Sequence, residues 1–174
     1  MNTRRLTTIA MLTAIYVVLS IMTPVKVANF KFTFEAFPIL VAGMLLGPVD
    51  GLITGTLGSF IYQLFFSGYG ITATTPLWIL PHAVSGLLTG LLARTFSFDL
   101  DFKKIMLISS LSAVTVTALN ILALYVDSKM YGYYSPALVF GNIAVKIAVG
   151  IILALIYSGV MPRLLSYLKK QTGR

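Results

Sequence analysis

Two pairs of polar residues stand inside apolar stretches of this sequence, each with the spacing of one helix face. Trp78 and His82 are the only tryptophan and the only histidine, and they lie four residues apart in "TTPLWILPH". Asn142 and Lys146 have the same spacing in "FGNIAVKIAVG". Residues four apart share a helix face. An indole offers a flat stacking surface and an imidazole offers one donor and one acceptor, so a planar heteroaromatic ligand would use both.

Two interpretations of the first pair stay open. Pro76 suits the first turn of a helix, and Pro81 predicts a kink about a turn later. In one interpretation Trp78 is an interfacial anchor in the lipid headgroups and His82 bonds to a neighbouring helix. In the other, the two side chains form one wall of a binding pocket.

Lys146 is costly for the membrane segment in which it stands. A lysine at such a position costs roughly 2.5–3.5 kcal/mol on insertion scales, and such residues usually face a protein interior. Counted along one helix from Ala137, it lies roughly 13 Å deep. Snorkelling to water is the alternative, but that depth favours a functional or paired lysine. Asn120 is a weaker candidate, because a single membrane asparagine often bonds only to another helix.

The segments expected outside the membrane hold further candidates. Lys31 lies in "PVKVANFKFT" and could meet an anionic ligand. Tyr131 belongs to a tyrosine cluster in "DSKMYGYYSP", which is either part of an interfacial belt or the lid of a pocket. Glu35 follows Thr33 at the start of an apolar segment, and we interpret the two as a helix N-terminus with Thr33 as the cap.

The composition is that of an integral membrane protein. Of 174 residues, 57% are hydrophobic and only 10% are charged, too few charges to cover the surface of a soluble domain. The absence of cysteine excludes disulfides and thiolate metal sites. No phosphate-binding glycine loop, HExxH motif or carboxylate cluster is present, so we expect no enzyme, no metal and no cofactor. The net charge of +8 does not indicate nucleic-acid binding, since the basic residues flank membrane segments and suit anionic lipid.

Six apolar segments predict an all-α protein of six transmembrane helices in one domain over residues 1–174. About twenty residues span a bilayer. The second, third and fourth segments are short and rich in glycine and proline, which predicts kinked or partly spanning helices. The segments are 6–23, 34–47, 50–66, 77–93, 105–126 and 137–161.

The basic residues predict the orientation. With six spans, nine lysines and arginines fall on the side of the termini and three on the opposite side, which places both termini in the cytoplasm. The nine are Arg4, Arg5, Arg94, Lys103, Lys104, Arg163, Lys169, Lys170 and Arg174.

Small residues recur at a spacing of four. Ala10 and Ala14 form one such pair in the first segment. Two glycine pairs repeat it: Gly51 with Gly55, and Gly86 with Gly90. Such pairs let helix backbones approach closely in lipid.

The chain resembles the substrate-binding S components of energy-coupling factor (ECF) vitamin transporters over nearly its whole length. The resemblance rests on "IAMLTAIYVVLS", on "FEAFPILVAGMLLGPVDGLITGTLGSFIYQL" with its GP-x-x-G turn, and on "TTPLWILPHAVSGLLTGLL". It implies that Ala10 and Ala14 contact a transmembrane coupling protein, which works with two ATPase subunits. It also implies an external pocket on the elements that carry Trp78, His82, Asn142 and Lys146.

The resemblance implies a receptor in a prokaryotic plasma membrane that captures a water-soluble vitamin outside the cell. Folate-type members carry a Pro-Gly-Phe-Thr-like stretch where this chain reads Thr-Thr-Pro-Leu-Trp. A smaller heterocycle, such as a pyrimidine, pyridine or flavin-type vitamin or precursor, fits the aromatic side chains as well or better. Two rivals stay open: a membrane-embedded enzyme with His82 as base and Asp50 or Asp127 as partner, and a purely structural subunit.

Overall fold

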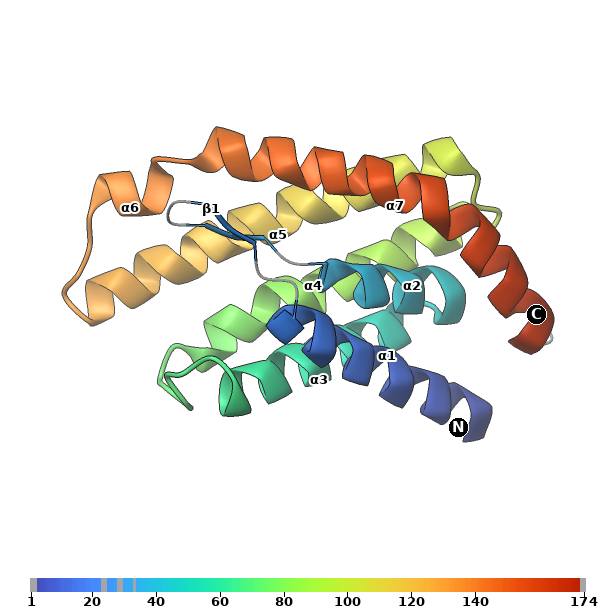
Figure 1. Cartoon of the computed structure of the whole chain (residues 1–174), viewed down its shortest axis with the longest axis horizontal. Helices are drawn as coiled ribbons and strands as arrows, with labels where there is room; N and C mark the ends of the chain where they lie inside the picture. The colour runs from blue at the N-terminus through green and yellow to red at the C-terminus, as the bar shows by residue number, and fades with distance from the viewer. Residues whose placement is uncertain (1–2, 23–24, 28–29, 33, 173–174) are drawn as a thin grey trace.

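The fold is a bundle of helices with one short β-hairpin (Figure 1). The computed structural model describes residues 3–22, 25–27, 30–32 and 34–172. Within these residues the elements are α1 (Thr3–Met22), β1 (Val25–Val27), β2 (Phe30–Phe32), α2 (Ala36–Leu46), α3 (Pro48–Phe65), α4 (Thr75–Thr95), α5 (Phe102–Met130), α6 (Pro136–Phe140) and α7 (Ile143–Thr172). The all-helical prediction is therefore confirmed for the body of the protein, and the antiparallel β1–β2 pair was not expected.

The helix lengths agree with most of the predicted segments. α1, α4, α5 and the stretch Pro136–Leu168 are long and apolar enough to cross a membrane, whereas α2 has only 11 residues. At 1.5 Å per residue, α2 is about 16 Å long and reaches only part of the way across a bilayer core. The expectation of a short fourth helix was wrong, because α4 extends to 21 residues in spite of Pro81.

The sixth apolar segment is broken where the sequence predicted one continuous helix. A turn at Gly141 and Asn142 separates α6 from α7. Lys146 therefore lies in the first turn of α7, and the depth of roughly 13 Å, counted along one helix from Ala137, was wrong.

Glycines allow α3 and α4 to pack backbone to backbone. A Cβ atom added to Gly51 would lie 2.3 Å from the carbonyl oxygen of Gly86, and one added to Gly55 would lie 2.2 Å from that of His82. No side chain fits at these distances. The predicted role of the glycine pairs is confirmed. The same contact places the backbone of His82 directly against α3.

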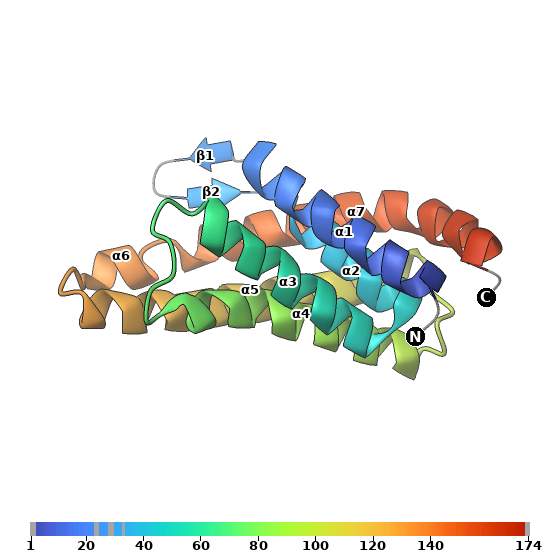
Figure 2. The same ribbon diagram turned by 90° about the horizontal axis from the view of Figure 1, so that it is seen from below.

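The bundle is filled in one half and hollow in the other. Both termini lie at one end, and α6 and the hairpin lie toward the opposite end (Figure 2). The apolar core occupies the half near the termini. Its buried members are Ile9, Leu40, Val41, Met44, Leu45, Leu46, Ala93, Ile105, Ile108, Tyr157, Met161 and Leu165. The half away from the termini is where a cavity forms.

Candidate functional site

A cavity of about 530 Å³ lies among α1, α2, α3, α4, α5, α6 and α7, largely in the half away from the termini. This volume is within the range of small-molecule sites. The polar and aromatic residues on its wall are Tyr16, Glu35, Ser59, Tyr62, Gln63, Trp78, His82, Ser85, Ser109, Ser112, Thr117, Asn120, Asn142, Lys146 and Tyr157.

The structure brings four of the residues singled out by spacing to this one cavity. Trp78 and His82 reach it from α4, Lys146 from α7 and Asn142 from the turn before α7. Asn120, the weaker candidate, lines the same cavity from α5. Their convergence is a property of the fold, since the two pairs are more than fifty residues apart in the chain. Their role in binding stays a prediction.

Two other predicted residues are not placed on this wall. Tyr131 is the C-cap residue of α5, is 53% exposed and does not belong to the residues that line the cavity. The backbone of Lys31 lies in β2, where it pairs with that of Lys26. The side chain of Lys31 lies outside the described part of the structure.

His82 faces a carboxylate that the sequence analysis assigned elsewhere. Its Nε2 lies 3.9 Å from Oε1 of Glu35, and the ring of Tyr16 stands edge-on to the imidazole with centroids 5.5 Å apart. Glu35 does occupy the N-cap position of α2, but its side chain makes no capping hydrogen bond. Thr33, the expected cap, lies outside the described residues. The helix starts near the expected place, but with Glu35 in the position expected for Thr33, and the carboxylate of Glu35 lies on the cavity wall.

Tyr16 owes its position to a glycine on α3. A Cβ atom at Gly58 would lie 2.5 Å from Cδ1 of Tyr16, so only glycine leaves room for the ring. Tyr16 is 1% exposed. The sequence signal for this contact was weak: Gly58 follows Gly55 by three residues, and nothing in the pattern pointed to Tyr16.

The indole of Trp78 is oriented by an acidic residue of α5. Its Nε1 lies 3.5 Å from Oδ1 of Asp127, a long hydrogen bond. The hydroxyls of Thr74 and Tyr133 also donate to Asp127. One carboxylate thus joins the start of α4, the end of α5 and the segment after α5. The sequence analysis considered Asp127 only as a catalytic partner of His82, whereas the structure places it against Trp78.

Two buried hydroxyls on the wall have no hydrogen-bond partner among the described residues. They are Ser109 Oγ and Tyr157 OH, on residues that are 2% and 4% exposed. A buried polar group without a partner costs roughly 1–3 kcal/mol. Ser85 and Ser112, by contrast, bond each other across α4 and α5 with their oxygens 2.6 Å apart. The cavity therefore offers polar atoms that a ligand or water would satisfy.

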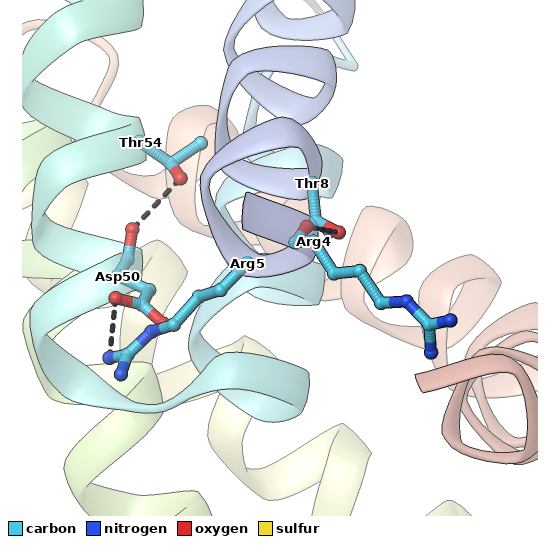
Figure 3. A network of polar contacts seen from close by, with 5 residues as sticks. All are labelled: Arg4, Arg5, Thr8, Asp50 and Thr54. Atoms are coloured by element: carbon cyan, nitrogen blue, oxygen red, sulfur yellow. Dashed lines mark hydrogen bonds and ion pairs between the residues drawn. The ribbon is translucent and has the colours of Figure 1, made fainter. Parts of the chain in front are cut away.

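The opposite end of the bundle is held by an ion pair. Arg5 on α1 donates from Nε and a terminal guanidinium nitrogen to both oxygens of Asp50 on α3, at 2.6 and 2.7 Å. Figure 3 shows Arg5 reaching across to Asp50, while Arg4 points to the other side of α1. Asp50 is 1% exposed. Asp50 thus stabilises the contact between two helices and does not face His82.

Ala10 and Ala14 lie on the exposed side of α1. The residues that α1 buries against the bundle are Ile9, Thr13, Tyr16 and Ser20, on the other side of the helix. Around the two alanines the surface is apolar, with Met11, Ile15 and Val18 at least 41% exposed. This surface is available to another membrane helix or to lipid.

Among the described residues no group of three or more histidine, cysteine or acidic side chains could hold a metal ion.

The comparison with protein families is decisive. The model of the ECF transporter substrate-specific component family matches residues 4–164. The chain belongs to this family. Members of this family are substrate-binding subunits of transporters, so the chain is not an enzyme, and Asp50 and Asp127 need no catalytic role.

Solved structures of ECF S components share the fold. The S component for biotin from an ECF-type ABC transporter is 17% identical, with a TM-score of 0.67 over 94% of both chains. FolT bound with folic acid is 19% identical, with a TM-score of 0.68 over 94% of this chain and 96% of that one. The S component of a bacterial ECF transporter is 25% identical, with a TM-score of 0.68 over 95% and 98%. No curated protein sequence matches the chain significantly.

As an ECF substrate-specific component, the chain is a multi-pass membrane protein that binds a small molecule and works with an ECF module. Many large apolar side chains are exposed around the bundle. This is consistent with a membrane environment, because there they contact lipid tails instead of water.

Proposed function

We propose that this S component captures a water-soluble heterocyclic vitamin or vitamin precursor outside the cell for ATP-driven uptake. The observation that carries the proposal is the convergence of Trp78, His82, Asn142 and Lys146 on one cavity of about 530 Å³. Biotin and folic acid, named for two of the similar structures, are ring-containing vitamins of this general kind.

Each wall residue has a distinct part in this proposal. Trp78 stacks on the flat ring, which is worth roughly 1–3 kcal/mol by analogy with base stacking on aromatic side chains. His82 and Asn142 supply a donor and an acceptor each. Lys146 donates a charged hydrogen bond, worth roughly 1.5–3 kcal/mol. Tyr131 and Lys31 would reach the ligand only from the outer segments.

Transport requires partners, because the chain contains no ATP-binding motif. We propose that a transmembrane coupling protein and two ATPase subunits of an ECF module supply the energy. The exposed positions of Ala10 and Ala14 on α1 support their assignment as the contact with the coupling protein. Small side chains there would let a partner helix approach closely.

The orientation follows from charge. We propose six membrane segments, of which α2 reaches only part of the way across, in one domain over residues 1–174, with both termini in the cytoplasm of a prokaryotic cell. Nine basic residues against three support this orientation. The end of the bundle opposite the termini, which holds most of the cavity, then faces outward.

The test is to identify what the protein binds. The chain is purified in mild detergent and denatured, and the released small molecules are identified by mass spectrometry. We expect one heterocyclic vitamin or precursor in about equimolar amount. Uptake of that compound by cells should require both this chain and the ECF module. A protein that releases no small molecule, or uptake that continues without the module, would contradict the proposal.

A further inference from the structure

The acidic and the basic polar groups of the cavity lie at two different levels along α7. Tyr157 and Lys146 both line the cavity and lie eleven residues apart on this helix. At 1.5 Å per residue, their backbones are about 16 Å apart along the axis. The groups that gather at these two levels differ in charge, and this difference constrains the shape and chemistry of the ligand.

Glu35 lies at the level of Tyr157. The rings of Phe34 and Phe37, which flank Glu35 in the chain, contact the ring of Tyr157 with centroids 6.5 and 5.5 Å apart. Glu35 is the only acidic side chain among the described residues that line the cavity. A carboxylate accepts hydrogen bonds and donates none. This level therefore favours a ligand group with N–H donors and disfavours an anion.

The groups beside Glu35 suit a flat ring. His82 lies 3.9 Å from the carboxylate, and Tyr16 stands edge-on to the imidazole. The partnerless hydroxyls of Ser109 and Tyr157 add polar atoms at this end. A heterocycle with ring and exocyclic nitrogens would satisfy the carboxylate, the imidazole and these hydroxyls together.

The groups at the level of Lys146 favour an anionic ligand group instead. Lys146 and Asn142 lie at the start of α7. A Cβ atom at Gly150 would lie 2.9 Å from Cβ of Ala113, so these positions on α5 and α7 are in contact. The two helices run in opposite directions (Figure 1), which places Asn120 level with the start of α7. An ammonium and two amides at one level form a donor-rich site that favours a carboxylate or a phosphate.

We propose that the ligand is elongated and bipolar: a flat heterocycle with N–H donors lies at Glu35 and His82, and an anionic group lies at Lys146, Asn142 and Asn120. This inference rests on the proposed function and adds the substrate class. The two levels are about 16 Å apart along α7, so only an elongated ligand reaches both. A compact, neutral heterocycle would leave the Lys146 level unused.

The first test is the chemistry of the compound that the wild-type protein releases. We expect a nitrogen heterocycle joined to a carboxylate or a phosphate at its far end. The compound is then neutralised, by methyl esterification of a carboxylate or by enzymatic removal of a phosphate, and this step identifies which anion is present. Wild-type protein should bind the anionic form at least tenfold more tightly than the neutralised form.

The second test assigns the preference to Lys146. Lys146→Met should lose the tenfold preference, whereas Lys146→Arg should keep it, and Lys103→Met at the exposed start of α5 is the matched control. Glu35→Gln should weaken binding of both forms about tenfold, with Asp99→Asn, which changes an exposed acid, as its control. Thermal unfolding without added compound shows that each variant is folded.

The outcomes separate the two proposals. A released heterocycle without an anionic group, or a preference that survives Lys146→Met in folded protein, overturns the bipolar ligand and leaves the vitamin receptor standing. A wild-type protein that releases no small molecule overturns the receptor, and the bipolar ligand with it.

Discussion

The indole of Trp78 and the carboxylate of Asp127 face each other across α4 and α5, with Nε1 3.5 Å from Oδ1. Forty-nine residues separate them in the chain. The same carboxylate accepts hydrogen bonds from Thr74 and Tyr133. Asp127 thus offers the indole of Trp78 a hydrogen-bond acceptor from outside the cavity wall.

Asp127→Asn should weaken vitamin binding about three- to tenfold, because a neutral amide replaces a charged acceptor and the loss is worth roughly 1 kcal/mol. The measurement is the fluorescence of Trp78, the only indole in the chain. In wild type, ligand addition should quench or shift the emission. In the variant, emission before addition should already be altered. Unchanged emission and affinity would show that Asp127 does not orient Trp78.

The bond from Tyr133 to Asp127 should persist throughout the neutral pH range. Partial burial, this hydrogen bond and the charge of Asp127 raise the pKa of the Tyr133 phenol to about 12. Because the folded-state pKa lies above the ordinary value of about 10, the stabilisation is complete below pH 10 and is lost as the pH rises through about 12. Tyr133→Phe, which removes the phenol, should abolish this alkaline dependence in thermal unfolding.

Arg5→Met should destabilise the protein by about 3 kcal/mol, since it leaves the buried carboxylate of Asp50 without its counter-ion. The low end of the usual range applies because the Arg5 side chain is 39% exposed. Thermal unfolding in detergent measures the loss. The matched control is Arg4→Met, which should change stability by less than about 0.5 kcal/mol. Arg5→Met combined with Asp50→Leu should recover most of the loss.

Gly86→Ala should force α3 and α4 apart. The new Cβ would lie 2.1 Å from the carbonyl oxygen of Gly51, and overpacking of this kind costs roughly 1–3 kcal/mol. Gly159→Ala is the control, because nothing beyond its own stretch of helix lies within 4 Å of a Cβ at that position. It should be neutral or stabilising by up to about 1 kcal/mol. Equal melting temperatures for the two variants would refute the close contact.

Tryptophan at both Ala10 and Ala14 should abolish uptake and co-purification with the coupling protein, because two indoles prevent a close helix approach. Binding to the isolated S component should change less than twofold, since both positions lie on the exposed side of α1. If binding falls as far as uptake, the two alanines serve the internal fold.

Epitope tags at the two ends should both be protected from protease added outside intact cells. The expectation rests on the nine basic residues on the side of the termini. Permeabilised cells give the positive control. Cleavage of either tag in intact cells would contradict the proposed orientation with both termini in the cytoplasm.

Local chemistry alone determined the membrane class, most of the helical segments and the four cavity residues whose spacing singled them out. The sequence alone reveals an indole, an imidazole, a lysine and an asparagine inside apolar stretches. Such groups are informative there because burying them without a partner is costly. The glycine spacing of four likewise predicted close helix packing, since close helix approach depends on side-chain size at known intervals. That α3 and α4 form this contact is known only from the structure.

Only the tertiary structure decided which groups these residues meet. Glu35 has the sequence of a helix start and occupies one, yet its side chain lies beside His82. Tyr16 reaches the same place because Gly58, forty-two residues later, leaves room for its ring. The break at Gly141 moved Lys146 to the first turn of α7. Periodicity reports which face of a helix a residue occupies, whereas the neighbour across that face depends on how separate helices pack, which no local pattern encodes.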